Sequence, residues 1–334
     1  MYAIELTAPS LNSFRRISRP DPVPGVGQVL VRMRAASLNF IDVAVATGHY
    51  PVDRFPLVPV CDGAGEVTAV GPEVQEYSIG QRVIAHSKPL WVGGPIEAVN
   101  STVMRGIALP GSVAEYVVLP ASALVPTPAH LSDVEAATLP IAATTAWNAI
   151  RASHVRPGSV VVLLGTGGVS IFALQLAKAA GATVILTSSS EEKLERAKRL
   201  GADLTINYRS TPAWDKEVLA VTQGRGADLV LETVGPETFD RSVNAVAYGG
   251  TLFLIGFVSG TRGGIDLLPI IVKALKVRGN NTGSVADLRD VTRAVAASGI
   301  KPVIDRTFSL DETAQAYTRL AGGGQHFGKI TIAH

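Results

Sequence analysis

Cysteine is almost absent from this sequence, which has Cys61 alone among its 334 residues. A single cysteine excludes an internal disulfide and any zinc site built from several cysteines. A chain without disulfides suits a reducing compartment, so we expect a cytoplasmic location. Cys61 itself is expected to be a small buried or pocket-lining residue rather than a reactive thiol.

The sequence also lacks a strong charge of one sign and a long apolar run. Its 30 basic and 28 acidic residues leave a formal net charge of +2, which gives no reason to expect nucleic acid or an anionic membrane as a partner. The most apolar stretch, residues 160–186, is interrupted by glycines and Lys178, so no membrane span is expected. The first residues contain no uninterrupted apolar core, so no secretory signal is expected.

Glycine and hydrophobic residues are plentiful. The chain contains 33 glycines, and 47% of its residues are hydrophobic, a composition that suits a compact α/β protein with many turns. Its length is enough for about two domains. Residues 1–122 carry short β-type runs between glycine and proline turns, which predicts a barrel-like domain. The clearest runs are Gln28–Ala35, Gly65–Val70, Arg82–Ala85 and Ala114–Leu119.

Helical and strand patterns alternate after about residue 123. The segment Ser132–Arg151 has a helical pattern that Pro140 must kink or interrupt, and Ser132 forms a capping box with Glu135. The alternation beyond it predicts a doubly wound parallel sheet with helices on both faces. The expected elements are the strands Val160–Leu164, Thr183–Thr187, Leu204–Asn207, Asp228–Thr233 and Thr251–Ile255, the helices Glu191–Leu200 and Glu237–Val246, and a final strand, Lys329–Ala333.

A glycine turn joins the first of these strands to a helix, and the turn reads GTGGVS from Gly165 to Ser170. Strand, glycine turn, helix and second strand within about thirty residues form a dinucleotide-binding unit. Gly165 allows a sharp turn, and Gly167 allows the backbone to approach a pyrophosphate. Gly168 and Val169 then open a helix whose unpaired N–H groups attract that anion. Ser170 stands where a third glycine is usual, so it should loosen the packing slightly or turn its hydroxyl to the phosphate.

The residues after the second strand indicate which dinucleotide binds. NAD-binding units usually place an acidic residue there, about 20 residues beyond the turn, to hold the ribose 2′-hydroxyl. This chain has Ser188, Ser189 and Ser190, followed closely by Lys193. Hydroxyls and an ammonium suit a 2′-phosphate, so we expect NADP(H). Alternatively, the serines cap the next helix, and both interpretations can hold together.

Three further stretches carry a resemblance to a known family. They read SLNFIDVAVATGHY from Ser37, FPLVPVCDGAGEVTAVGPEVQEYSIGQRV from Phe55, and GGGQHFGKITI from Gly322. With the glycine turn, they resemble the medium-chain dehydrogenase/reductase superfamily, in its zinc-free quinone oxidoreductase and alcohol dehydrogenase-like branch. The resemblance implies a GroES-like β-barrel domain, residues 1–122 completed by 269–334, and a Rossmann domain, residues 123–268. It also implies an active site in the cleft between them and a homo-oligomer. Many members are homodimers or tetramers that pair through the edge of the Rossmann sheet, and we expect a homodimer here.

The resemblance also bears on metal chemistry. Zinc-dependent members carry Cys at the position of Asn39, a His-Glu pair at Cys61-Asp62, and a further ligand near Ile141. These residues cannot supply the three ligands of a catalytic zinc, so no metal is expected. Without a Lewis acid, simple alcohol oxidation becomes harder. Quinones and conjugated enones depend less on a Lewis acid, because their carbonyl group already activates the carbon that accepts hydride.

The same resemblance suggests residues beside the substrate. Asn39, Asp42 and Tyr50 match the family's Asn, Asp and Tyr, and we consider them the catalytic candidates. Asn39 could bond the cofactor or the substrate oxygen, and Tyr50 could donate its hydroxyl or stack on a flat quinone. Each also has a purely structural interpretation: Asp42 as a helix cap, Asn39 as a turn residue and Tyr50 as a packed aromatic at the rim.

Further candidates concern the cofactor. Val234 follows a strand of the predicted parallel sheet, where ligands bind beyond the carboxyl ends of strands, and Asn280 could reach the same cleft. The others match family positions near the nicotinamide or the phosphates, although Lys329 could instead be a solvated lysine at a strand start. These are Thr145, Tyr208, Gly256, Phe257, Val258 and Lys329.

These observations predict a zinc-independent, NADPH-dependent oxidoreductase that passes hydride to a quinone or an α,β-unsaturated carbonyl. An alternative is an alcohol or ketone dehydrogenase that works without zinc. A third possibility, from another class, is a non-catalytic NADPH-binding protein, because the branch that the chain resembles includes lens crystallins. A small carbonyl, enone or quinone is the expected substrate in the first two cases.

Overall fold

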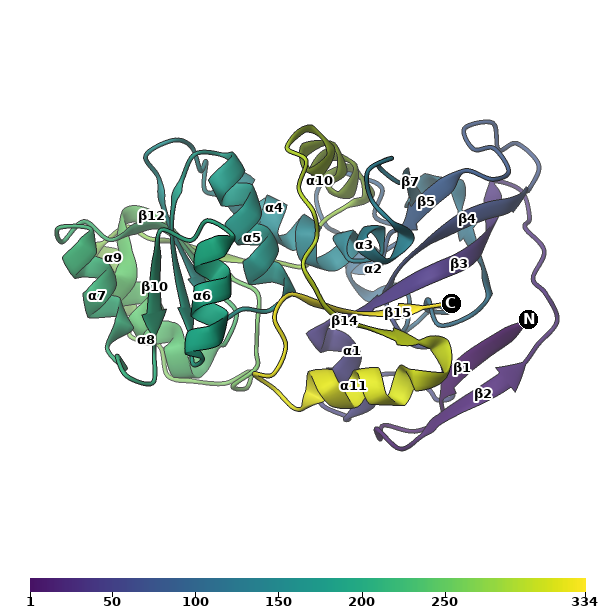
Figure 1. The fold of residues 1–334 in the computed structure, drawn as a ribbon, viewed down its shortest axis with the longest axis horizontal. Helices are drawn as coiled ribbons and strands as arrows, with labels where there is room; N and C mark the ends of the chain where they lie inside the picture. The colour runs from purple at the N-terminus through teal and green to yellow at the C-terminus, as the bar shows by residue number, and fades with distance from the viewer. The chain divides into compact units, whose positions relative to one another are not determined.

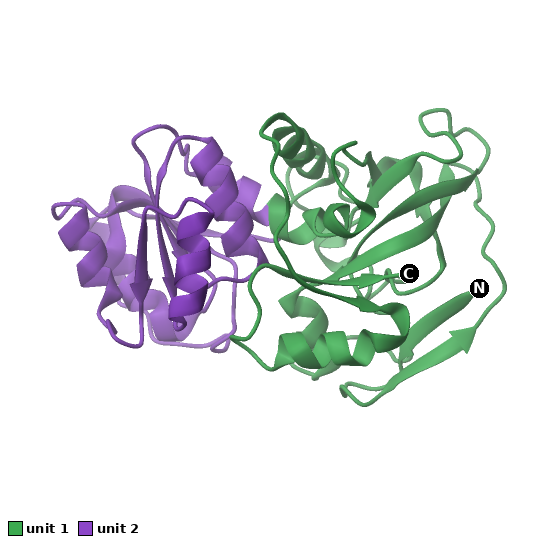
Figure 2. Ribbon diagram, in the orientation of Figure 1, with its two compact units in different colours: residues 1–144, 283–334 green, residues 145–282 purple.

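The computed structural model describes residues 1–334 and divides into two compact units. Unit 1 comprises residues 1–144 and 283–334, and unit 2 comprises residues 145–282 (Figure 2). The expected divisions, after residues 122 and 268, differ from these. Strand β7 (Leu124–Pro126) pairs with the sheet of unit 1, and β13 (Lys276–Gly279) pairs with that of unit 2, so each boundary lies further along the chain.

The main sheet of unit 1 has seven strands in the order β14-β15-β3-β4-β5-β7, with β6 paired to β3. A separate antiparallel pair, β1 and β2, precedes it. The strands are β1 Tyr2–Leu6, β2 Phe14–Ser18, β3 Gln28–Leu38, β4 Asp62–Val70, β5 Arg82–Ala85, β6 Tyr116–Pro120, β14 Ile304–Ser309 and β15 Lys329–Ala333. The sheet belongs to a GroES-like domain, as expected.

The last strand completes the domain that the first strands begin. Strand β15 lies antiparallel to β3, with Ile330 opposite Leu38 and Ala333 opposite Ala35 (Figure 1). Strand β4 lies on the other side of β3, with Asp62 opposite Ser37. The start of β15, the end of β3 and the start of β4 therefore meet at one place in the sheet.

Alternating residues of β3 explain why this strand is central. Val29, Val31 and Met33 are buried in the core of unit 1, where they pack with residues of β1, β4, β5, β6 and β15. Each buried side chain of this size contributes roughly 1.5–3 kcal/mol of stability relative to an exposed one. The helices of unit 1 are α1 Phe40–Ala46, α2 Ala98–Thr102, α3 Asp133–Ala136, α10 Val285–Ala297 and α11 Thr313–Ala321.

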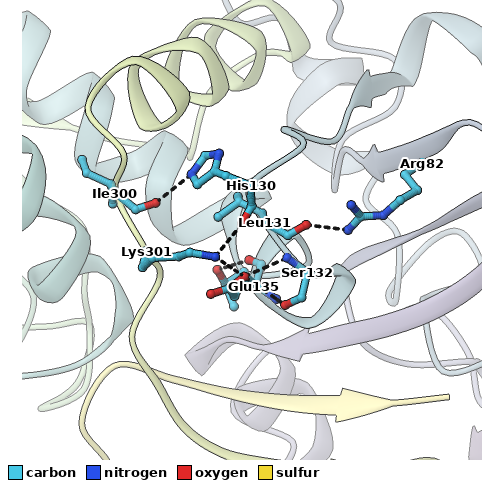
Figure 3. A network of polar contacts seen from close by, with 8 residues as sticks. Arg82, His130, Leu131, Ser132, Glu135, Ile300 and Lys301 are labelled. Atoms are coloured by element: carbon cyan, nitrogen blue, oxygen red, sulfur yellow. Dashed lines mark hydrogen bonds and ion pairs between the residues drawn. The ribbon is translucent and has the colours of Figure 1, made fainter.

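A polar network fastens the segment after α10 to the rest of unit 1 (Figure 3). Lys301 donates to the carbonyl oxygen of His130 and forms an ion pair with Glu135 at 3.2 Å. The His130 ring contacts the carbonyl oxygen of Ile300 at 3.2 Å. Arg82 donates to the carbonyl oxygen of Leu131 at 2.7 Å. These bonds hold the returning chain in position before β14 and β15 begin.

Unit 2 is built on a six-stranded, wholly parallel sheet in the order β10-β9-β8-β11-β12-β13. The remaining strands are β8 Val160–Leu164, β9 Thr183–Ser188, β10 Leu204–Asn207, β11 Ala227–Glu232 and β12 Val246–Leu254. The first strand of this unit, β8, lies in the middle, and the order reverses between β8 and β11. This is the doubly wound Rossmann arrangement that the sequence predicted.

Helices cover both faces of this sheet. Trp214 and Val218 of α7 and Phe239 and Val243 of α8 form a core with β-strand residues such as Val230. The helices α5 and α6 contact β8, β9 and β10. The helices are α4 Thr144–Ala152, α5 Gly168–Ala179, α6 Glu191–Arg199, α7 Trp214–Val221, α8 Pro236–Ala245 and α9 Leu267–Val272. None of the helices has the length and apolar character that crossing a bilayer requires.

The predicted helix Ser132–Arg151 is divided into three parts. Helix α3 carries the expected capping box between Ser132 and Glu135. A π-helical turn, Leu139–Ala143, then contains Pro140, and α4 follows directly. Proline has no N–H to donate within a helix, which explains the interruption that the sequence predicted.

Candidate functional site

The glycine turn of unit 2 forms the anion-binding geometry that its sequence predicted. Gly165 has a φ of +73°, and a Cβ atom at this position would meet no heavy atom within 4 Å. Gly167 is the N-cap of α5, and no side chain caps this helix end. The N–H groups of Gly168 and Val169 thus begin a 12-residue helix whose N-terminus is open to an anion. The turn fits a dinucleotide pyrophosphate.

Ser170 has a different role from the two that we expected. Its side chain is buried, and its Oγ donates to the carbonyl oxygen of Leu164 at 2.8 Å. The hydroxyl therefore ties α5 to the end of β8 instead of loosening the packing. It is bound within the protein, so the expectation that it faces a phosphate is wrong.

The turn after β11 lies next to β8 in the sheet and is organised by Glu232. This buried carboxylate accepts hydrogen bonds from the backbone N–H of Val234 at 2.8 Å and of Gly235 at 3.0 Å. It also accepts from the hydroxyls of Thr238 and Ser242. Sequence reasoning missed Glu232, whose role becomes visible only from these contacts. Val234 is held at the point where the strand order reverses, which is where ligands bind in such sheets.

The end of β9 carries the residues that we assigned to the 2′-phosphate. Ser190 is the N-cap of α6, and its Oγ accepts from the backbone N–H of Lys193 at 3.4 Å. The capping interpretation is therefore confirmed. Ser188 is buried, Ser189 is half-buried, and Lys193 is 9% exposed. Their contact with a cofactor stays a prediction.

An arginine that the sequence analysis did not select lies beside this group. Asn207, the last residue of β10, lies opposite Ser188, and the Tyr208 N–H donates to the Ser188 carbonyl oxygen at 3.1 Å. Tyr208 is 43% exposed, and the next residue, Arg209, is also exposed. Arg209 follows the family-matched Tyr208 directly, which is the signal that could have indicated it.

The remaining cofactor candidates of unit 2 have varied surroundings. Thr145 is buried near the start of α4, whereas Val258 is 61% exposed. The Asn280 amide, oriented so that both its atoms have partners, bonds the backbone of Thr282 at 3.0 and 3.1 Å. Gly256 follows β12, and a Cβ atom there would lie 1.7 Å from the Thr233 carbonyl oxygen. Glycine is thus required at this position by the packing of the loop itself. Phe257 lies between Gly256 and Val258 in the same loop.

A second group of polar residues lies in unit 1, where β15, β3 and β4 meet. The Nζ of Lys329 donates to Oδ1 of Asn39 and to the carbonyl oxygen of Leu38, both at 2.6 Å. Nδ2 of Asn39 donates to Oδ2 of Asp62 at 2.9 Å and to the carbonyl oxygen of Ser37 at 3.4 Å. The Asn39 amide thus joins an ammonium to a carboxylate.

Asp62 is the member of this group that sequence reasoning missed as a functional candidate. It is fully buried, and Oδ2 also accepts from the backbone N–H of Ile141 at 3.1 Å, whereas Oδ1 has no partner. Burial raises the pKa of Asp62 to about 7, although the Lys329 ammonium lowers it. The sequence feature that could have indicated Asp62 is its place in the Cys61-Asp62 pair, which aligns with a metal-binding pair in zinc-dependent relatives.

Lys329 is not the solvated lysine that one interpretation of the sequence allowed. It is 3% exposed, and burial lowers the pKa of its ammonium while Asp62 opposes that change. Its bonds to Asn39 and Leu38 give it a role within unit 1. Contact with a cofactor phosphate, as the family resemblance implied, stays a prediction.

Asp42 has the structural role that we considered as its alternative. It is the third residue of α1, whose N-cap is Asn39, and Oδ2 accepts from the Asn39 N–H at 2.8 Å. Oδ1 accepts from the N–H of Cys61 at 3.0 Å. Burial raises the pKa of Asp42 and these backbone bonds lower it. Tyr50, by contrast, is 37% exposed and available to a ligand.

Comparison with known proteins agrees with this geometry. Residues 25–129 match the alcohol dehydrogenase GroES-like domain, and residues 168–297 match the family described as zinc-binding dehydrogenase. A zinc-type alcohol dehydrogenase-like protein of Schizosaccharomyces pombe is 42% identical over 315 residues, which cover 92% of this chain and 90% of that protein. A quinone oxidoreductase of Pseudomonas aeruginosa is 34% identical over 309 residues, 89% of each chain. The solved structure of an NAD-dependent alcohol dehydrogenase, 35% identical, covers 100% of both chains with a TM-score of 0.91.

The chain belongs to the medium-chain dehydrogenase/reductase superfamily. The expected family is therefore confirmed, and with it an oxidoreductase built on a fold that binds a nicotinamide dinucleotide. The open N-terminus of α5 in unit 2 fits that cofactor.

A catalytic zinc does not fit the donors of this superfamily member. Asn39 Oδ1 is bonded to the Lys329 ammonium, whose positive charge would also repel a zinc ion beside it. Burial, followed by the nearby Asp42 and Asp62, raises the pKa of the Cys61 thiol well above its usual value. Ile141 offers no side-chain donor. The structure contains no group of three or more His, Cys, Asp or Glu side chains arranged to hold a metal ion.

Proposed function

We propose that this protein is a zinc-independent, NADPH-dependent reductase of quinones or α,β-unsaturated carbonyls. The observation that carries the proposal is the bond from the Lys329 ammonium to Asn39 Oδ1 at 2.6 Å. Asn39 aligns with a zinc ligand of metal-dependent relatives, and here its Oδ1 accepts a hydrogen bond from a lysine side chain of unit 1. Reactions that need a strong Lewis acid on the substrate oxygen are therefore disfavoured here.

The chain's own residues would bind and orient NADPH, which would supply the hydride when bound. The N–H groups at the start of α5 would hold the pyrophosphate. Val234 and the loop of Gly256, Phe257 and Val258 follow β11 and β12, the strands next to β8. A conjugated carbonyl accepts hydride at carbon and spreads the resulting charge onto oxygen, so it reacts without a metal bound to that oxygen.

The choice of NADPH is supported by the end of β9. No carboxylate stands at Ser188 or Ser189, where an acidic residue would repel a 2′-phosphate. The nearby Glu191 carboxylate accepts a hydrogen bond from Nδ2 of Asn207. The cations near this strand end are Lys193 and the exposed Arg209, and guanidinium and ammonium groups are common partners of phosphate.

A second candidate function is an alcohol or ketone dehydrogenase that works without zinc. It is favoured by the names of the Schizosaccharomyces pombe relative and of the NAD-dependent alcohol dehydrogenase structure. A protein that binds NADPH without turnover is a third candidate, which a negative result with every acceptor would support.

One assay separates these candidates. Purified protein is mixed with NADPH, or with NADH, and with a small quinone, an enone or a simple ketone, and loss of the reduced nicotinamide is followed by absorbance. We expect turnover of the quinone or the enone, faster with NADPH. Turnover of the ketone alone would replace the proposal by the dehydrogenase function. Absence of turnover in the presence of measurable NADPH binding would favour a non-catalytic role.

The proposed enzyme is also a cytoplasmic homodimer. All four residues of β13, an edge strand, are exposed, so the strand leaves hydrogen-bonding groups of the sheet unpaired. Apolar side chains of α9 and β13 are exposed on the same unit, at 41–70%. They are Leu267, Leu268, Ile271, Val272 and Val277. A second copy pairing its own β13 across a two-fold axis would satisfy both features.

Light scattering tests the homodimer directly. The wild-type protein is expected to have the mass of two chains. The Ile271→Lys substitution should lower the measured mass toward that of one chain. Val221→Lys, at an exposed apolar residue of α7, is the control. A wild-type mass of one chain would contradict the proposal.

A further inference from the structure

We propose that Lys329 and Asp62 are positioning residues: their opposite charges, linked through the Asn39 amide, fix that amide in one orientation and leave it only a hydrogen-bond acceptor for a ligand. The inference rests on the proposed function, because it concerns the same site. It assigns a role to two buried residues and excludes one of the roles considered for Asn39, a hydrogen bond donated to the substrate oxygen.

The three side chains form a hydrogen-bonded series in unit 1, with Asn39 between the two charged groups. Lys329 is 3% exposed and Asp62 is fully buried, whereas Asn39 is half-buried. Neither charged group lies in a direct ion pair with the other. Each reaches the other through Asn39, whose Oδ1 accepts from Lys329 and whose Nδ2 donates to Asp62. Asn39 is therefore the member of the group that a ligand can reach.

The charges decide which way the amide faces. In the reversed orientation the NH2 group would face the ammonium, and the carbonyl oxygen would face the carboxylate. Two buried charges would then lose a hydrogen bond and gain a repulsive contact, which is a severe cost away from water. An isolated asparagine has no such constraint, so the single orientation comes from Lys329 and Asp62 together.

The fixed orientation uses all the donors of Asn39. Both N–H groups point to oxygen atoms of the protein, one on Asp62 and one on the Ser37 carbonyl. Oδ1 has two lone pairs, and Lys329 occupies one. The remaining lone pair can only accept a hydrogen bond. Asn39 therefore suits a ligand that offers a hydroxyl or an amide N–H, such as a reduced product, and it does not polarise a substrate carbonyl.

The sheet makes the arrangement rigid. Lys329 begins β15, Asn39 directly follows β3, and Asp62 begins β4, and these are three neighbouring strands. Backbone pairing of the strands sets the three Cα positions before any side-chain bond forms. Such support from regular structure holds a functional group more accurately than a loop does.

A double-mutant cycle tests the coupling of the charges. The variants are compared at about pH 8, above the pKa of about 7 of Asp62, so that its carboxylate is ionised. Lys329→Met and Asp62→Asn then each leave one buried charge without its counterpart, whereas the double variant removes both. We expect each single variant to lower the melting temperature and to reduce kcat roughly ten- to 100-fold. The double variant should recover at least half of the lost melting temperature, with kcat still reduced. Additive losses in the double variant would overturn the proposal.

The exposed ion pair Lys198–Glu195, on α6, provides the matched control. When Lys198→Met and Glu195→Gln are combined, the melting temperature should show no comparable recovery, because solvent screens these charges. If the wild-type protein reduces no quinone or enone, the proposed function fails. The melting temperatures of the cycle still decide whether the two buried charges are linked.

A charge exchange provides a second test that does not remove Lys329. In Asn39→Asp, two carboxylates face each other, and we expect a lower melting temperature than in the wild type. Adding Asp62→Asn restores an ammonium–carboxylate–amide series, so Asn39→Asp/Asp62→Asn should melt at a higher temperature than Asn39→Asp. An equal or lower temperature would contradict the proposed pairing, even if the Lys329→Met variant does not fold.

Discussion

Oγ of Ser170 lies 2.8 Å from the carbonyl oxygen of Leu164, so the residue that replaces the third glycine of the turn bonds the helix to its strand. The same carbonyl accepts from the hydroxyl of Thr233 at 2.9 Å. Two hydroxyls thus meet at the carboxyl end of β8, next to the proposed pyrophosphate site. The serine that stands in place of the usual third glycine therefore adds a stabilising hydrogen bond.

Ser170→Ala should therefore destabilise the protein by about 0.5–1.5 kcal/mol, the usual net value of one hydrogen bond. The loss should stay in this range because Thr233 still satisfies the Leu164 carbonyl. Urea denaturation measures the change, and Ser189→Ala, at a half-buried serine after β9, should have no comparable effect. An unchanged denaturation midpoint for Ser170→Ala would show that the bond contributes nothing.

Lys193→Ala should weaken NADPH binding far more than NADH binding, because only NADPH carries the 2′-phosphate. Arg209→Ala should act in the same direction if this arginine shares the phosphate. Titration of each variant with both cofactors measures the ratio of the two dissociation constants. Lys198→Ala lies on the same helix and should leave the ratio unchanged. Equal losses for NADPH and NADH would remove Lys193 as a 2′-phosphate contact.

Chelation should leave activity unchanged, because the donors around Asn39 and Asp62 do not fit zinc. The protein is dialysed against a strong chelator, and turnover is then measured with and without added zinc. Activity that disappears with the chelator and returns with zinc would contradict the zinc-independent function.

Asp62 should make the stability depend on pH. The folded protein keeps a proton on Asp62 up to a pKa of about 7, whereas the unfolded chain releases it near 3.8. The folded state thus binds more protons between these values, so this contribution to stability falls as the pH rises through them. The groups acting on Asp62 are Lys329, which lowers its pKa, Asp42, which raises it, and the buried Arg105 and Cys61.

The measurement compares unfolding free energies of the wild type and Asp62→Asn from pH 4 to pH 8. The difference between the curves isolates Asp62 from other groups, such as His86, whose pKa is lowered by burial to about 4 and whose effect has the opposite sign. We expect the wild type to lose stability relative to the variant as the pH rises. A constant difference would mean that Asp62 does not titrate in this range.

The sequence alone determined the local elements and the cofactor-binding turn. Strands Arg82–Ala85, Val160–Leu164, Leu204–Asn207 and Lys329–Ala333 have the bounds that their sequence patterns predicted. Gly165 and Gly167 indicated the helix N-terminus correctly. These features follow from side-chain periodicity and from the backbone freedom of glycine, both of which are properties of neighbouring residues.

Only the tertiary structure decided how the functional side chains are used. Lys329 could be solvated or buried, and Asn39 could donate or accept, until the pairing of β15, β3 and β4 brought them together with Asp62. Ser170 likewise acquired its partner from the end of β8. Residues 39, 62 and 329 are far apart in the chain, so their contact depends on strand register, and burial then sets which charges must be paired.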